Sequence, residues 1–195
     1  HAAQVRHVHP GIVVLRLLER AVRGPVAVGE KHDSARVERR VDLDPESRRM
    51  AVELGVVDRC EEDLAAACVG ADVIQLAVPI LAMQKLLGAL AQLPLGDAVL
   101  TDVGSAKGNV VRAAALAFDG VPPRFVPGHP IAGSEQSGVE ASNGQLFRRH
   151  KVILTPLADT DGAALQMVDR LWRELGADVE HMEVEHHDEV LAATS

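Results

Sequence analysis

The feature that most constrains the fold is a regular alternation of short apolar runs with amphipathic segments from Val41 onward. The clearest run, Asp72–Pro79 (DVIQLAVP), is almost continuously apolar, which is typical of a strand covered on both faces of a parallel sheet. Strands that alternate with helices over short links indicate crossover connections. The pattern therefore predicts an α/β fold, a Rossmann-type parallel sheet with crossover helices.

The same pattern gives approximate bounds for each element. The expected strands are 41–43, 72–79, 97–103, 151–156 and 177–183. The expected helices are 45–55, 63–70, 80–93, 105–118, 160–176 and 183–195. Residues 125–140, which include His129, have no clear period, and we expect an irregular loop there.

The first 40 residues do not continue this pattern. They contain one helical stretch, Ile12–Arg23, and we expect residues 1–40 to be an atypical segment. A dinucleotide-binding fold opens with a strand, a G-x-G-x-x-G loop and a helix, and no window here has that spacing. The glycines are Gly11, Gly24 and Gly29. The chain also begins with His1 and ends within a helical pattern, and both ends suggest a fragment.

Composition excludes several classes of function. The chain has 195 residues, 47% hydrophobic and 25% charged, which is ordinary for a globular protein. A formal net charge of -8 argues against nucleic-acid binding, which needs a basic surface. The most apolar region is interrupted by Gln75 and Pro79 and is too short to cross a bilayer, so no membrane partner is expected. Cys60 and Cys68 fit idle thiols in a reducing, cytoplasmic protein better than a redox pair or a metal site.

In a parallel sheet, ligands bind at the carboxyl ends of the strands. The loops after Pro79, Val103 and Val126 should therefore lie at one edge, which places His129 near Ser105. A long loop inside a compact domain is typically functional, so His129 is the candidate for chemistry. The histidines at 181, 186 and 187 lie in an acidic stretch that we expect to be solvated. Because His186 and His187 are adjacent and point to different faces, we expect no metal site.

Other candidates have two interpretations each. Asp42 would bind an adenosine ribose, or it would simply belong to a turn before the helix at Pro45. Ser105 would have a catalytic role, or it would cap the helix that follows Gly104. Lys107 lies in a first helical turn, where the helix dipole disfavours a cation. A ligand or partner carboxylate would explain that lysine, and so would plain solvation.

Six segments occur in an order that resembles one known family. They are VDLDPESRRMAVELGVVDR, ADVIQLAVPI, TDVGSAKG, PGHPIAGSEQSGVEAS, LFRRHKVILTP and HHDEVLAATS. Together they resemble the prephenate dehydrogenase family, which includes arogenate and cyclohexadienyl dehydrogenases. The resemblance covers about Val41–Ser195, and the pair TDVGSAKG and GHPIAGSE is the most specific part of it.

The resemblance implies an NAD-dependent oxidative decarboxylation of prephenate to 4-hydroxyphenylpyruvate in tyrosine biosynthesis, with arogenate as another substrate. It implies that His129 takes or polarises the proton of the substrate hydroxyl, and that Ser105 helps to order this hydroxyl and the histidine. The cofactor-binding residues that it implies are Asp42, Val78, Pro79, Asp102, Val103 and Gly104. An acid at Asp42 favours NAD over NADP, because it would repel a 2′-phosphate.

The resemblance also implies three parts: the atypical segment 1–40, an NAD-binding domain at 41–183, and at 184–195 the start of a helical dimerisation domain that is missing here. We expect the full-length parent to be a homodimer and the chain alone to have little or no activity. The alternative is a non-catalytic fragment with a vestigial cofactor site. A different NAD-linked reductase, such as a 3-hydroxyacid dehydrogenase, is disfavoured by GHPIAGSE.

Overall fold

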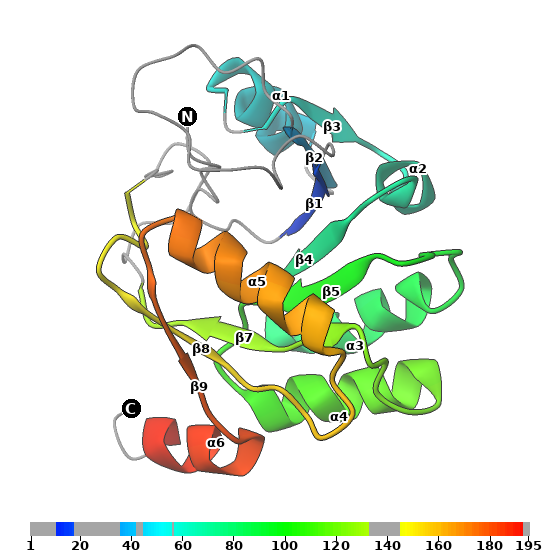
Figure 1. The fold of residues 1–195 in the computed structure, drawn as a ribbon. Coiled ribbons are helices and arrows are strands. Elements are labelled where there is room, and N and C mark those ends of the chain that lie inside the picture. The colour runs from blue at the N-terminus through cyan, green and yellow to red at the C-terminus, as the bar shows by residue number, and fades with distance from the viewer. Residues whose placement is uncertain (1–10, 18–35, 42–44, 56, 133–144, 193–195) are drawn as a thin grey trace.

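The computed structural model of the chain forms two sheets with helices around them (Figure 1). It describes residues 11–17, 36–41, 45–55, 57–132 and 145–192. Within these ranges, every helix is too short or too polar to cross a membrane.

The larger sheet has six strands in the order β3-β2-β1-β4-β5-β6. Its strands are β1 (Gly11–Leu17), β2 (Arg36–Val41), β3 (Arg59–Glu61), β4 (Val73–Ala77), β5 (Val99–Asp102) and β6 (Phe125–Val126). The smaller sheet, in the order β7-β8-β9, contains β7 (Gly128–Pro130), β8 (Lys151–Leu154) and β9 (Asp178–His181). The helices are α1 (Pro45–Glu53), α2 (Leu64–Cys68), α3 (Ile80–Leu90), α4 (Lys107–Phe118), α5 (Gly162–Glu174) and α6 (Val184–Ala192).

The predicted parallel arrangement is confirmed for β4, β5 and β6, and also for the pair β2 and β3. All five residues of β4 are buried, as its continuous apolar run predicted. Alternate side chains of the strands face two cores. Val73 and Val99 belong to the core that includes Trp172 of α5, and Ile74 and Leu100 to the core under α3 and α4. The helices therefore cover both faces (Figure 1).

The predicted helix over Ile12–Arg23 is wrong for its first half, because Gly11–Leu17 is strand β1. The β-branched residues at positions 12 to 14 favour a strand once neighbours are available for pairing. Strand β1 runs antiparallel to both β2 and β4, so the sheet is mixed and not wholly parallel. Gly11 pairs with Ala77 and Leu15 with Val73, so β1 starts at the carboxyl edge of β4 and ends at the opposite edge. The assignment of residues 1–40 to an atypical segment stays a prediction, since most of them lie outside the described residues.

The irregular loop predicted around His129 begins instead as a strand. Residues Gly128–Pro130 form β7, and His129 pairs with Ile153 of β8 in an antiparallel ladder. Only one residue, Pro127, separates β7 from β6. A ladder on one side fixes the backbone of the histidine more firmly than a loop would. The remainder of the predicted loop, at positions 133–140, lies outside the described residues.

Helix α6 lies against α4, with hydrogen bonds between residues 80 and 81 positions apart in the chain (Figure 1). Sequence analysis assigned residues 184–195 to the start of a separate helical domain, and that assignment stays a prediction. In this structure the described part of the segment is in contact with the α/β domain.

Candidate active site

The carboxyl edge of β4 and β5 presents most of the cofactor-binding residues that the sequence predicted. Val78, Val103 and Gly104 are partly exposed there, and Pro79 is exposed at the start of α3. Ser105 is exposed in the turn between β5 and α4. Asp42, the predicted ribose ligand, lies outside the described residues.

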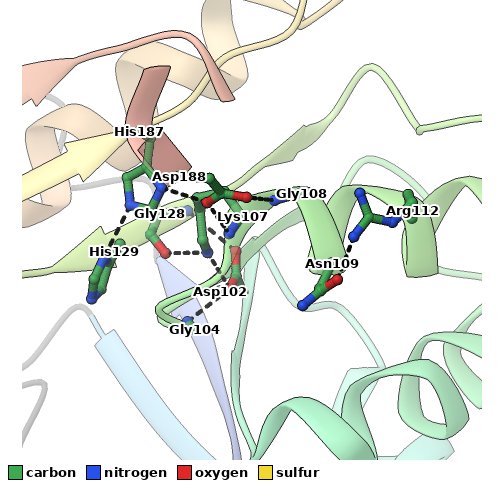
Figure 2. A network of polar contacts seen from close by, with 10 residues as sticks. All are labelled: Asp102, Gly104, Lys107, Gly108, Asn109, Arg112, Gly128, His129, His187 and Asp188. Carbon is green, nitrogen blue, oxygen red and sulfur yellow. Dashed lines mark hydrogen bonds and ion pairs between the residues drawn. The ribbon is translucent and has the colours of Figure 1, made fainter. Parts of the chain in front are cut away.

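Asp102 differs from the other edge residues because its carboxylate is fully buried and turned into the protein. Its Oδ2 accepts hydrogen bonds from Lys107 Nζ at 2.5 Å and from the Gly104 backbone N–H at 2.8 Å. Its Oδ1 accepts from the Gly128 N–H at 3.2 Å. The carboxylate therefore links the end of β5 to the start of β7, beside His129 (Figure 2).

Lys107 has no exposed surface, so the solvated interpretation of this lysine is wrong. Its ammonium donates to Asp102 and to the carbonyl oxygen of Gly128, at 2.6 Å. Burial lowers the pKa of Lys107, while the charges of Asp102 and Asp188 oppose that shift. A buried ion pair with an additional carbonyl acceptor compensates a cation that the helix dipole alone would disfavour.

His129 contacts a second histidine that sequence analysis placed in solvent. His129 Nδ1 lies 3.0 Å from His187 Nε2, and the rings meet edge to face with centroids 5.2 Å apart. His187 has no exposed surface, so its predicted solvation is wrong, whereas His181 and His186 are exposed as expected. The spacing of Val184 and His187, three residues apart on one helical face, was a signal that could have identified the buried side of α6.

Asp188, next to this histidine, holds the start of α4. Its Oδ1 accepts from the Lys107 N–H at 2.9 Å and its Oδ2 from the Gly108 N–H at 2.9 Å. Oδ1 also lies 2.8 Å from His187 Nδ1. The capping role considered for Ser105 is wrong, since Ala106 occupies the N-cap position without a side-chain hydrogen bond and Asp188 satisfies the helix N–H groups.

The electrostatics of this cluster favour a neutral His129. Burial lowers its pKa to about 4, and the charge of Lys107 acts in the same direction against the opposing effect of Asp188. The pKa of Asp188 is also lowered. Burial raises it, but the hydrogen bonds from His187, Gly108 and Lys107 together lower it by more. Near neutral pH the partly exposed His129 ring is thus uncharged. Among the described residues, no group of three or more His, Cys, Asp or Glu side chains is arranged to hold a metal ion.

The strand order and the exposed carboxyl edge are those of a Rossmann-type nucleotide-binding domain. The chain belongs to the prephenate dehydrogenase family, since residues 30–181 match the family model described as prephenate dehydrogenase, nucleotide-binding domain. Curated relatives include a cyclohexadienyl dehydrogenase of Zymomonas mobilis, 38% identical over 149 residues, which cover 76% of this chain and 49% of the relative. A prephenate dehydrogenase of Bacillus subtilis is 33% identical over 174 residues, which cover 87% of this chain and 46% of the relative. The chain spans about half the length of these relatives.

Solved structures of the prephenate dehydrogenase family also resemble this chain. Prephenate dehydrogenase from Aquifex aeolicus superposes with a TM-score of 0.73 at 39% identity, covering 80% of this chain and 55% of that one. A structure of the A. aeolicus enzyme in complex with hydroxyphenyl propionate and NAD+ has a TM-score of 0.71 at 39% identity, covering 77% and 52%. Arogenate dehydrogenase from Synechocystis has a TM-score of 0.71 at 29% identity, covering 80% and 54%. The Rossmann-type α/β fold expected from the sequence is confirmed.

Proposed function

We propose that this chain is the nucleotide-binding part of a dehydrogenase that oxidises and decarboxylates prephenate to 4-hydroxyphenylpyruvate, a step of tyrosine synthesis. The observation that supports it most is His129, a neutral ring held at the carboxyl edge by a buried polar cluster. Arogenate, the substrate in the name of the Synechocystis relative, is the second substrate candidate.

The reaction needs a base at the substrate hydroxyl. As the hydride leaves the ring carbon, the hydroxyl proton must move to an acceptor and the C–O bond becomes a carbonyl. The C–C bond to the ring carboxylate then breaks, CO₂ leaves, and the electron pair makes the ring aromatic with a phenolic oxygen that regains a proton. His129 is the residue that we propose accepts and returns this proton. We propose that Ser105, exposed in the turn between β5 and α4, orders the hydroxyl.

NAD, when bound, accepts the hydride. Residues at the carboxyl edge fit one part of such a cofactor, because Val78, Pro79, Val103 and Gly104 are accessible there. A Cβ at Gly104 would lie 3.0 Å from Asp102 Oδ2, so this glycine makes room for the buried carboxylate. Asp42 is the proposed ribose ligand and the reason to expect NAD rather than NADP. We do not propose that the Asp102 side chain binds the cofactor directly, because its carboxylate already pairs with Lys107.

The pyrophosphate of NAD fits the described residues less well than the part of the cofactor at the carboxyl edge. In the Rossmann arrangement the first strand ends at the ligand edge and leads into a helix whose N-terminus binds phosphate. Here β1 runs in the opposite direction and ends at the far edge of the sheet. This observation favours the second candidate, a non-catalytic chain with a vestigial cofactor site, for the 195 residues taken alone.

A chimera separates the two candidates. Residues 41–195 replace the matching segment of the Z. mobilis cyclohexadienyl dehydrogenase, whose own first strand and remaining domain are retained. We expect the chimera to reduce NAD with prephenate, and the 195-residue chain to show little or no turnover. A folded chimera without turnover on prephenate or arogenate would contradict the catalytic proposal. Turnover of about 1–10³ s⁻¹ by the chain alone would instead contradict the proposed weakness of its phosphate site.

Two further proposals accompany the function. We propose that the complete parent protein is a homodimer and that it acts in the cytoplasm on a small-molecule substrate, without nucleic acid or membrane. Sedimentation of the chimera against its host enzyme tests the first.

A further inference from the structure

We infer that His187 and Asp188 fix the tautomer of His129, so that its Nδ1 is protonated and its Nε2 is the atom that receives the substrate proton. This inference rests on the proposed function for its catalytic meaning, but the tautomer itself is a property of the folded chain. His187 and Asp188 are positioning residues here, because they act through His129.

The chain of hydrogen bonds begins at Asp188. Its Oδ1 lies 2.8 Å from His187 Nδ1, and an ionised carboxylate only accepts hydrogen bonds. His187 Nδ1 must therefore be protonated. In a neutral imidazole one nitrogen is a donor and the other an acceptor, so His187 Nε2 is then an acceptor.

The next link fixes His129. Its Nδ1 lies 3.0 Å from His187 Nε2, and with Nε2 of His187 as acceptor the proton must be on His129 Nδ1. His129 Nε2 is then unprotonated. In Figure 2 this nitrogen points away from the cluster, which leaves it available to a substrate at the sheet edge. An isolated histidine would have no such preference imposed on it.

A doubly protonated His187 would reverse the last hydrogen bond and place the proton of His129 on Nε2. Two observations disfavour that state. His187 has no exposed surface, so a charge on its ring would be desolvated, and the buried ammonium of Lys107 contacts the same cluster. The Asp188 carboxylate does not need a buried imidazolium as its partner, because two backbone N–H groups at the start of α4 already donate hydrogen bonds to it.

The arrangement also matters after proton transfer. When His129 Nε2 receives a proton, Nδ1 remains the donor to His187. The positive charge on the His129 ring is then connected through His187 to the Asp188 carboxylate. A serine protease uses a carboxylate for the same two purposes, orientation and stabilisation of the imidazolium. Here a second histidine is inserted between the base and the acid.

The test is long-range ¹H–¹⁵N NMR at pH 7 on the 195-residue chain with ¹⁵N-labelled histidine, with the His129 signals assigned by loss in His129→Asn. We expect one neutral tautomer with the proton on Nδ1. A proton on Nε2, a rapid mixture of tautomers or a charged ring would each overturn the inference. In His187→Phe, which keeps a ring but removes the acceptor, the single tautomer should become a mixture. Asp169→Asn is the matched control, since Asp169 pairs with the exposed His181 at 2.9 Å and should leave His129 unchanged.

The kinetic readout uses the chimera. His187→Phe should lower kcat at least about tenfold with a smaller change in KM, as loss of the correct tautomer does in a catalytic triad. If His129 has its proton on Nδ1 but the wild-type chimera does not turn over, the proposed function fails and the tautomer stands. If the chimera turns over but His129 has its proton on Nε2, the tautomer inference fails and the proposed function stands. An unchanged kcat in a folded His187→Phe chimera would remove the positioning role.

Discussion

Replacement of Gly108 by alanine tests the contact between α6 and α4. An added Cβ at Gly108 would lie 2.8 Å from Asp188 Oδ2 and 3.2 Å from Arg112 Nη1. Arg112 is exposed and can move, but the Asp188 carboxylate is held by two backbone N–H groups of α4 and by His187. The methyl group should therefore displace the carboxylate from the helix start.

The magnitude follows from two opposing effects. Glycine to alanine inside a helix stabilises by roughly 0.5–1 kcal/mol when space is free. Loss of a side chain that caps helix N–H groups costs about 0.5–2 kcal/mol. Gly88 of α3 is the matched control, because a Cβ there would have no atom within 4 Å. We expect Gly88→Ala to raise the free energy of unfolding by about 0.5–1 kcal/mol and Gly108→Ala, as the difference between the two effects, to lower it by roughly 0.5 kcal/mol.

Urea unfolding of the 195-residue chain measures both changes, at constant denaturant dependence. A double-mutant cycle adds Asp188→Ala, in which Gly108→Ala should no longer destabilise because the displaced group is absent. Equal stabilisation by the two glycine substitutions would refute the contact. The same loss in the Asp188→Ala background would show that another atom is responsible.

Three further outcomes are expected. Lys107→Met should destabilise the chain by about 3–5 kcal/mol in urea unfolding, because it leaves the Asp102 carboxylate buried without its partner. The control Lys151→Met, at the exposed pair with Glu180, should cost at most about 1 kcal/mol. Equal losses of stability in the two variants would contradict the burial of Lys107. The folded-state pKa of His129 is about 4, below its ordinary value of 6.5, so the unfolded state binds more protons between these values and stability should fall as pH drops from 6.5 to 4. This contribution is at most about 3 kcal/mol and is reduced by partial exposure of the ring. His129→Asn should flatten that part of the pH profile, and an unchanged profile would contradict the lowered pKa. NAD should bind the chimera more tightly than NADP in calorimetry, and equal affinities would remove Asp42 from the cofactor site.

The elements that the sequence predicted best are those whose burial is determined locally. The continuous apolar run of β4 could only be a strand covered on both faces, and Gly55 and Gly176, which have φ of 62° and 83°, lie just past the ends of α1 and α5 as their positions predicted. The direction of β1 could not be predicted, because strand direction depends on neighbours that pair from distant parts of the chain. Periodicity also favoured a helix there until those neighbours were known.

The site shows the same division. The place of His129 was predicted from the loops that follow Pro79, Val103 and Val126, and that placement needs only the order of the elements; its catalytic role is a proposal. The buried role of His187 depends on α6 lying against α4, a contact across about 80 residues that no local pattern encodes. Lys107 was difficult for a related reason, since a lysine in a first helical turn normally indicates solvent exposure. Its partners, Asp102 and Gly128, become neighbours only when β5, α4 and β7 are assembled.

The most direct test of the proposed chemistry is the steady-state rate of NADH formation from NAD and prephenate by the chimera and by its His129→Asn variant. Melting temperature is measured on the same preparations. We predict turnover by the chimera and a kcat about 10²–10⁴-fold lower in the variant, with a much smaller change in KM because the interaction is made mainly in the transition state. An unchanged kcat per folded molecule, accompanied only by a lower melting temperature, would contradict the assignment of His129 as the base.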